Sequence, residues 1–523
     1  MGRYLSSVTQ LMRTGGWFFI GLFLLSGKPV AGELTKGPML LRAETGRAAL
    51  MFESDRPARA QVFWSEAGQS QPMSLSSYPI DINYRLGELP IMRFVHKVWL
   101  EGLRPAAEYK YYILEHRMTE PSPTYTFRTP KGRDEAVRFA VYGDCRSFAE
   151  QHRRIIQRII QEGVNFVVVT GDLVGDGNQY EKWSEEFFDP LKGLAESVPI
   201  YALKGNHDQS KEGYFEKLLV PPGENSSFSF NYGSVHYWCG DNYSEEAGKL
   251  LAMMEQDIKS SRGGWLFVSL HEPSLNLGGH YSTWGYPQAL PTFSRTGVDF
   301  VVTGHSHIYE RFRPLAPPKD TKGSFVTFIT TAGGGAPLHE SGTSEYLAQG
   351  LSRHHFCLFE VTPQKVQLRV IDIDGAVIDQ LEVTKQGGQP NKAYTDTAVP
   401  MELIQLYQDL RHCVFKAPVR PRKQESFEMA ASLSAPSIKT AVKAILKLRC
   451  AEGTYKVGPE KTVEILPVGG MAQVRFSVQA LVDTKAAGQR ARLLDPALWI
   501  DCHYEISQGS GDISWPVLDP NQP

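Results

Sequence analysis

The stretch FAVYGDCRS, residues 139–147, decides how the centre of this chain is built. A short apolar run that ends in Gly-Asp predicts a buried strand that aims one carboxylate, Asp144, out of the end of a sheet. Four later strand ends deliver similar polar residues, namely Asp172, the pair Asn206 and His207, His271, and the pair His305 and His307. Because ligands of open α/β sheets bind at the carboxyl ends of strands, we expect these side chains to gather on one rim.

The length and the pattern of the chain indicate about three domains. It has 523 residues, 42% hydrophobic and 21% charged, which is a globular composition. Apolar runs alternate with helical stretches over residues 136–385, which predicts a layered α/β domain. Residues 33–130 read as a β-sandwich that serves as spacer or lid, 386–414 as a linker with a short helix, and 415–523 as a second β-sandwich. The sequence of that last domain is equally compatible with packing on the α/β domain, with binding a surface and with mediating assembly of several chains.

The first 32 residues resemble a signal peptide. Arg3 and Arg13 precede an apolar stretch at residues 17–25, and small residues lead to a cleavage site near Glu33. This predicts an exported protein, secreted or periplasmic. The alternative is an uncleaved anchor, which is the one membrane contact that we expect.

The net charge and the cysteine spacing limit which ligands and cross-links the sequence predicts. The net charge is −2 and the pI about 6.7, so no basic surface for nucleic acid is evident. The six cysteines lack the CxxC and CxH spacings of thiolate metal sites. In an exported chain one pair near the C-terminus could be bridged, for example Cys450 with Cys502, although sequence alone does not fix the pairing.

The five strand ends together carry a chemical signal that each lacks alone. A lone Gly-Asp is usually a turn, GNHD can cap a helix, and HxH is common in loops. As a set they supply carboxylate oxygens and imidazoles without thiolates, which suits Zn, Mn or Fe. A central Asp can bridge two metals, and two metals about 3.5–4 Å apart can clamp a phosphate and activate a water.

The order Asp, GD, GNH, H, GHxH resembles the calcineurin-like metallophosphoesterases over residues 139–311. The closer resemblance is to purple acid phosphatases and their bacterial relatives with a fibronectin III-like N-terminal domain, carried by GVDFVVTGHSHIYER, LHEPSLNLGGH, FNYGSVHY and the earlier YTFRTP. It implies a four-layer α/β sandwich with flanking β-sandwiches. It also implies two divalent metals, or iron with a divalent metal (Fe, Zn or Mn), and hydrolysis of small phosphoesters by a metal-activated hydroxide.

The resemblance assigns roles to individual residues. Asp172 would bridge both metals. Asn206, His271 and His305 would complete one metal, while Asp144 and His307 would hold the other. His207 would act as general acid or charge stabiliser, and His280 would face the substrate unless it is merely a solvated loop residue.

Two positions depart from the family pattern. Purple acid phosphatases carry a Tyr where this chain has Gly175, so the ferric charge-transfer colour should be absent. Most other members carry a His where this chain has Arg146, which leaves the second metal one ligand short. His152 is a candidate replacement, against a helix-surface or capping role, and Tyr180 is a weaker one. Arg146 itself fits a phosphate-binding guanidinium, or an ordinary ion pair to Asp144 or Asp176.

Two functions follow from these residues. The first is a metal-dependent phosphoric ester hydrolase, either acid phosphatase-like or a phosphodiesterase. The alternative is a catalytically weakened surface-binding protein that keeps the fold, suggested by the missing ligands and the flanking sandwiches. Retention of His207 and of every ligand to the other metal argues for the enzyme.

Overall fold

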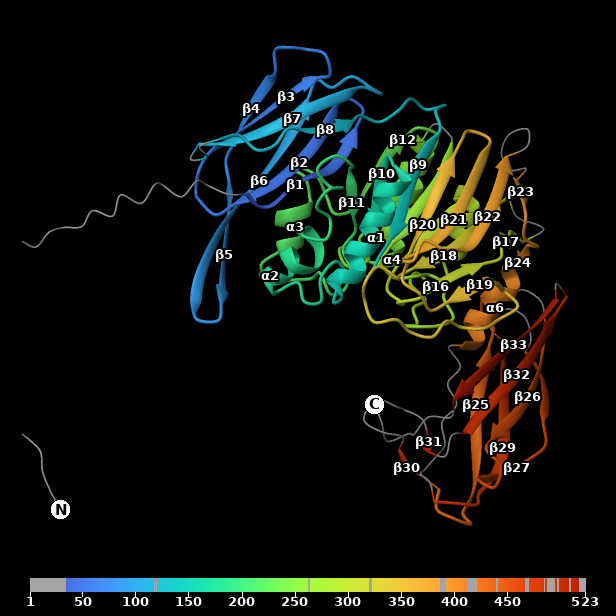
Figure 1. Ribbon diagram of the computed structural model, residues 1–523. Coiled ribbons are helices and arrows are strands. Elements are labelled where there is room, and N and C mark those ends of the chain that lie inside the picture. The colour runs from blue at the N-terminus through green and yellow to red at the C-terminus, as the bar shows by residue number, and fades with distance from the viewer. Residues whose placement is uncertain are drawn as a thin grey trace, which may run out of the picture.

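The computed structural model describes residues 34–516 except 117, 119, 262–263, 319–321, 386–391, 412–420, 439–440, 466–469, 484, 487–493, 496–497 and 508. The predicted signal peptide at residues 1–32 lies outside the described residues. Three β-rich units follow one another across the molecule, coloured from blue through green to red (Figure 1). In the described part of the chain, no helix is both long enough and apolar enough to cross a bilayer.

The N-terminal unit consists of two antiparallel sheets packed face to face. One has the order β1-β2-β6-β5 and the other β4-β3-β7-β8. Burial alternates along strands such as β3 and β7, so one face of each sheet enters a core that contains Trp64, Tyr111 and Phe127. The strands are β1 Leu34–Glu44, β2 Arg47–Ser54, β3 Ala60–Glu66, β4 Met73–Ser77, β5 Ile80–Leu86, β6 Leu89–Glu101, β7 Glu108–Glu115 and β8 Tyr125–Arg128.

The central unit is built on two seven-stranded mixed sheets. The first has the order β11-β10-β9-β20-β21-β22-β23 and the second β12-β13-β14-β15-β18-β16-β19. The first comprises β9 Val137–Tyr142, β10 Phe166–Val169, β11 Ile200–Ala202, β20 His355–Val361, β21 Lys365–Asp372, β22 Val377–Lys385 and β23 Lys392–Tyr394. The second comprises β12 Phe228–Tyr232, β13 Val235–Cys239, β14 Trp265–Leu270, β15 Phe300–Thr303, β16 Tyr309–Phe312, β18 Thr327–Thr331 and β19 Leu347–Leu351.

The two central sheets face each other and are covered by helices on their outer sides. Aromatic side chains fill the space between them, and the Phe139 ring of β9 lies 5.3 Å from the Phe267 ring of β14. The helix α1 packs its buried isoleucines on the first sheet, while α4 and α5 pack on the second. This is the predicted four-layer arrangement. The helical segments are α1 Ala149–Glu162, α2 Tyr180–Lys182, a π-helical turn Trp183–Phe188, α3 Tyr214–Leu219, α4 Ala247–Ser260 and α5 Ala289–Thr296.

The C-terminal unit is a second pair of antiparallel sheets, ordered β25-β29-β27 and β28-β26-β32-β33. Part of the predicted linker is ordered structure, because β23 pairs with β22 and α6 (Met401–Arg411) follows. The remaining strands are β17 Leu315–Ala316, β24 Val399–Pro400, β25 Ser426–Ser434, β26 Val442–Cys450, β27 Tyr455–Val457, β28 Lys461–Ile465, β29 Met471–Ala480, β30 Lys485–Ala486, β31 Leu494–Asp495, β32 Leu498–Ile506 and β33 Gly509–Pro516.

The suggested bridge between Cys450 and Cys502 is wrong. The two residues lie on the neighbouring strands β26 and β32, but Cys450 is opposite Leu498 and Cys502 is opposite Leu446. A separation of four residues along paired strands is about 13 Å, far beyond the Cα distance that a disulfide spans.

Both flanking units contact the central unit. On the N-terminal side, the buried Glu53 accepts hydrogen bonds from Lys36 Nζ at 2.8 Å and from the Tyr180 hydroxyl. On the C-terminal side, α6 lies between the central sheets and the last sandwich (Figure 1). Its Gln408 side chain donates to the Ser274 carbonyl at 2.7 Å, and Asp409 accepts from the Tyr286 hydroxyl. The Arg411 guanidinium lies 3.6 Å from the centre of the Tyr281 ring.

Candidate metal centre

The predicted site residues follow the carboxyl ends of five parallel strands. β9, β10 and β11 are parallel neighbours in the first sheet, and β14 and β15 are parallel neighbours in the second. The predicted rim therefore draws on both sheets. Four of the residues take positive φ values, a strained conformation that is concentrated at functional sites: 56° at Asp144, 54° at Asp172, 72° at His305 and 54° at His307.

Three of the predicted ligands converge at the spacing that a metal ion requires, and Asp172 lies beside them. Asn206 Oδ1 lies 3.1 Å from both His271 Nε2 and His305 Nδ1, and those two nitrogens are 3.3 Å apart. Asp172 Oδ1 lies 3.4 Å from His271 Nε2. Ligands bound at 2.0–2.2 Å around a tetrahedral ion are about 3.3 Å apart, so these donor atoms fit a cation.

The imidazoles of this cage are held with a ring nitrogen facing the other ligand atoms. His271 Nδ1 donates to the Thr170 carbonyl at 2.8 Å, which leaves the Nε2 lone pair facing the other donors. Burial lowers the pKa of His305 to about 3, so this ring stays unprotonated at neutral pH. A metal ligand must have such a free lone pair.

The predicted site of the second metal has fewer ligands, and one carboxylate oxygen there has no hydrogen-bond partner. Asp144 Oδ1 is buried without a hydrogen-bond partner and lies 3.5 Å from His307 Nε2. His307 Nδ1 donates to the Pro337 carbonyl at 2.8 Å, so its Nε2 lone pair faces the site. Burial and the neighbouring Asp172 raise the pKa of Asp144. An orphaned carboxylate oxygen beside a second carboxylate is the environment that a cation would relieve.

The Asp172 carboxylate behaves as the charged centre of the rim. Burial acts to raise its pKa, but His271 and the His207 backbone N–H outweigh burial and hold that pKa below its usual value. The His207 N–H donates to Asp172 Oδ1 at 3.0 Å. A carboxylate that stays ionised between two donor groups suits the bridging role that the sequence resemblance implied.

Arg146 lies inside the site. Its Nε donates to Asp172 Oδ2 at 3.3 Å, and its terminal nitrogen lies 3.2 Å from His307 Nε2. The side chain is 13% exposed. The ion pair is therefore with Asp172, and the alternative pairs to Asp144 or Asp176 are not formed. The guanidinium places a positive charge between two predicted ligands.

His207 lies beside the rim, with one ring nitrogen held in place. Its Nδ1 donates to the Gly175 carbonyl at 2.7 Å, and its Nε2 lies 3.9 Å from Asp172 Oδ2. The ring is about one-third exposed. Gly175, where purple acid phosphatases carry a Tyr, thus supplies a backbone acceptor that orients His207.

The two suggested replacement ligands point elsewhere. His152 is buried with both nitrogens engaged, one 2.8 Å from the Tyr142 hydroxyl and the other 2.9 Å from the Glu186 carbonyl. The Tyr180 hydroxyl donates to Glu53 in the N-terminal sandwich. Neither side chain reaches the rim, so the structure contradicts both candidates.

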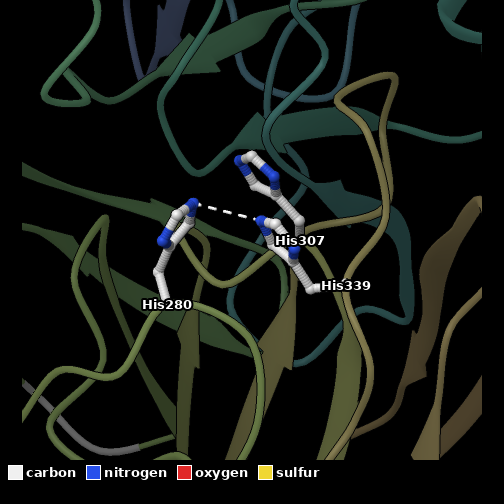
Figure 2. Close-up of side chains that lie close together, drawn as sticks. All are labelled: His280, His307 and His339. Carbon is white, nitrogen blue, oxygen red and sulfur yellow. Dashed lines mark hydrogen bonds between the residues drawn. The ribbon is translucent and has the colours of Figure 1, made fainter. Parts of the chain in front are cut away.

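Two residues at the site were not predicted from the sequence. Asp208 accepts backbone N–H groups from Leu173, Val174 and Gly205 at 2.8–3.2 Å, which ties together the loops after β10 and β11. His339 follows β18 and lies beside His280 and His307 (Figure 2). The strand end and the Gly333–Gly335 run before His339 were the signals that could have indicated it.

Comparisons with known proteins agree with this geometry. Residues 137–309 match the sequence model of the family described as calcineurin-like phosphoesterase. Purple acid phosphatase 21 of Arabidopsis thaliana is 27% identical over 265 residues, covering 46% of this chain and 58% of the relative. Acid phosphatase type 7 of Mus musculus is 23% identical over 436 residues, covering 71% of this chain and 97% of the relative. The chain spans 58%, 61% and 57% of the first three Arabidopsis relatives.

A solved structure shows the same fold. The purple acid phosphatase PPD1 from yellow lupin (Lupinus luteus) seeds superposes with a TM-score of 0.58 at 18% identity, covering 67% of this chain and 74% of that one. The chain therefore contains a calcineurin-like phosphoesterase domain with the metallophosphoesterase fold. Its homologues include purple acid phosphatases, which confirms the predicted resemblance to them, while the fibronectin III-like character of the N-terminal unit stays a prediction.

Proposed function

We propose that this chain is an exported hydrolase that cleaves small phosphoesters with two divalent cations held at the rim. The observation that carries the proposal is that His271 Nε2 lies 3.1–3.4 Å from ligand atoms of Asn206, His305 and Asp172, beside the orphaned Asp144 oxygen. Homology to phosphatases supports the reaction class. The apolar stretch at residues 17–25 supports export.

The residues divide between two cations. Asp172, Asn206, His271 and His305 would hold one, and Asp144 and His307 would contribute to the other, with Asp172 shared. When bound, such cations neutralise phosphate charge and make water a stronger nucleophile at neutral pH. The unprotonated His305 ring and the ionised Asp172 are the protonation states that this role requires.

His207 is suited to serve the leaving group. With Nδ1–H fixed on the Gly175 carbonyl, Nε2 on the side of Asp172 is the nitrogen that would bring a proton to the leaving group. That proton can be donated to the leaving oxygen as the ester bond breaks, which makes His207 the proposed general acid. Its partial exposure leaves space for the substrate beside the ring.

Arg146 is suited to bind the phosphoryl group. Its guanidinium offers several N–H donors in a planar fork that matches phosphate oxygens. Its contacts with Asp172 and His307 hold the side chain at the rim. A fixed positive charge here compensates for the ligand that the sequence lacks at this position.

Hydrolysis of two chromogenic esters tests the proposal. We expect the chelator-treated protein to be inactive toward p-nitrophenyl phosphate and bis(p-nitrophenyl) phosphate, and Mn, Zn, Fe or Co to restore turnover. His207→Ala should lower the turnover while bound metal stays unchanged. Turnover of neither ester, with less than about one metal ion per chain, would instead favour the surface-binding alternative.

A further inference from the structure

Two loops bring a pair of imidazoles over the open side of the rim. His280 lies in the loop between β14 and α5, and His339 in the loop between β18 and β19. Their Nε2 atoms are 3.2 Å apart (Figure 2). The His280 ring lies 5.5 Å from the His305 ring and 5.0 Å from the His307 ring. His280 is exposed and His339 partly exposed, so both can reach a bound molecule.

A buried carboxylate fastens these two loops to each other. Glu310 is fully buried and accepts the backbone N–H groups of Leu277, Gly278 and Gly342, each at 2.8 Å. The first two belong to the His280 loop and the third to the His339 loop. Hydrogen bonds to a charged acceptor are roughly twice as strong as neutral ones, so Glu310 sets the distance between the two loops.

Further backbone contacts fix the two histidines individually. The His280 carbonyl accepts from Asn276 Nδ2 and from Ser306 Oγ, both at 2.9 Å. The His339 N–H donates to the His307 carbonyl at 3.1 Å. The imidazole pair is therefore part of a rigid frame, as a binding group must be.

Ring geometry argues against a metal ion on this pair together with His307. The His307 and His339 rings are stacked, with centroids 4.9 Å apart and planes within 7° of each other. An imidazole binds a metal through a lone pair in its own plane, so two stacked rings do not direct both lone pairs at one ion. His280 and His339 are better suited to donate hydrogen bonds to an oxygen anion.

Resting on the proposed function, we propose that His280 and His339 bind the third terminal phosphoryl oxygen and so select phosphomonoesters over phosphodiesters. A monoester has three terminal oxygens and a diester two, with a second ester group in place of the third. In the free protein the two Nε2 atoms are hydrogen-bonded to each other, and a charged oxygen that enters between them replaces that bond and accepts an N–H from each ring. An ester oxygen carries no full charge, so its hydrogen bonds to the pair are weaker, and its carbon substituent would collide with the two rings.

Comparing the two chromogenic esters on the metal-loaded full chain tests this selectivity. We expect His339→Ala to lower kcat/KM for p-nitrophenyl phosphate about 10–100-fold, the effect of losing hydrogen bonds to a charged oxygen. The value for bis(p-nitrophenyl) phosphate should change less than about threefold. His503→Ala, at a 41% exposed histidine on β32, is the matched control and should change neither. An equal fall for both esters would overturn the inference.

Two further measurements separate this subsite from the reaction itself. Inorganic phosphate should bind more weakly to His339→Ala by about tenfold in calorimetry, whether or not the wild type hydrolyses esters. If turnover is absent but this weakening is found, the proposed function fails and the subsite stands. If His339→Ala loses bound metal, His339 is a ligand and the inference is wrong.

Glu310 provides an independent check as a positioning residue. Glu310→Gln keeps the size of the side chain but replaces one acceptor oxygen with an amide N–H₂ group. It should lower the monoester to diester ratio of kcat/KM in the same direction as His339→Ala. In the His339→Ala/Glu310→Gln double variant this ratio should fall by less than the two single effects combined, because both substitutions act through the His280–His339 pair. A ratio unchanged in Glu310→Gln would show that the loops are not coupled in this way.

Discussion

Removing the Glu53 carboxylate should destabilise the whole N-terminal half of the protein. Glu53 is completely buried and pairs with the buried Lys36 through contacts of 2.8 and 3.0 Å. It also accepts hydrogen bonds from Thr35 and Tyr180. In Glu53→Ala the Lys36 ammonium stays buried without its counter-ion. Burial already lowers the pKa of Lys36, which shows that its charge is expensive to hold there.

The expected loss is large because one partner of a buried pair remains. Breaking such a pair costs about 3–5 kcal/mol. At about 4–8 °C per kcal/mol for a domain of 60–100 residues, the size of the N-terminal sandwich, Tm should fall by roughly 12–40 °C. The control is Glu66→Ala, which breaks an ion pair with Arg104, a side chain that is 71% exposed. Because solvent screens an exposed ion pair, that change should leave Tm close to that of the wild type.

Scanning calorimetry of the full chain distinguishes the two variants. We expect the first transition of Glu53→Ala to move well below that of the wild type, while Glu66→Ala melts within about 3 °C of it. Equal shifts for the two variants would refute the reasoning, since burial would then make no difference. Such a result would also mean that the hydrogen bond from Tyr180 to Glu53 does not stabilise the contact between the N-terminal sandwich and α2.

Three further predictions concern the rim and its support. Arg146→Ala should lower kcat/KM about 10–100-fold at unchanged metal content; loss of metal with intact phosphate affinity would contradict this. His271→Ala should remove about one metal ion per chain, measured by elemental analysis, and full retention of metal would show that it is not a ligand. Burial lowers the pKa of His152 to about 4, below its unfolded value of about 6.5. The folded state therefore loses stability as pH falls from about 6.5 to 4, by up to about 3 kcal/mol. The fall of Tm between pH 6.5 and 4 should be shallower in His152→Gln. An unchanged dependence of Tm on pH would contradict the role given to His152.

The sequence predicted the rim well because strand ends are a local signal. Apolar runs identify strands that are covered on both faces, and the polar residues after them share one edge of the sheets. Asp144, Asp172, Asn206, His271 and His305 lie as expected for this reason. No knowledge of the side-chain contacts was needed to bring them together.

Features that depend on three-dimensional packing were missed or predicted wrongly. His152 follows Asp144 by only eight residues, yet the face of α1 that carries it turns toward Tyr142 and away from the rim. The pairing register of β26 and β32 excludes the suggested disulfide, and register is not readable from two isolated cysteines. His339 sits far along a glycine-rich loop, so its approach to His280 depends on how Glu310 gathers the two loops.

The contacts of α6 have a consequence for the modularity of this chain. This helix touches the His280 loop through Gln408, Asp409 and Arg411, and its other side belongs to the core of the last sandwich. The loop that carries His280 and the C-terminal third are thus packed together through α6. A relative that exchanged or lost its last domain would have to rebuild the loop after β14 as well, so the two parts are expected to be inherited together.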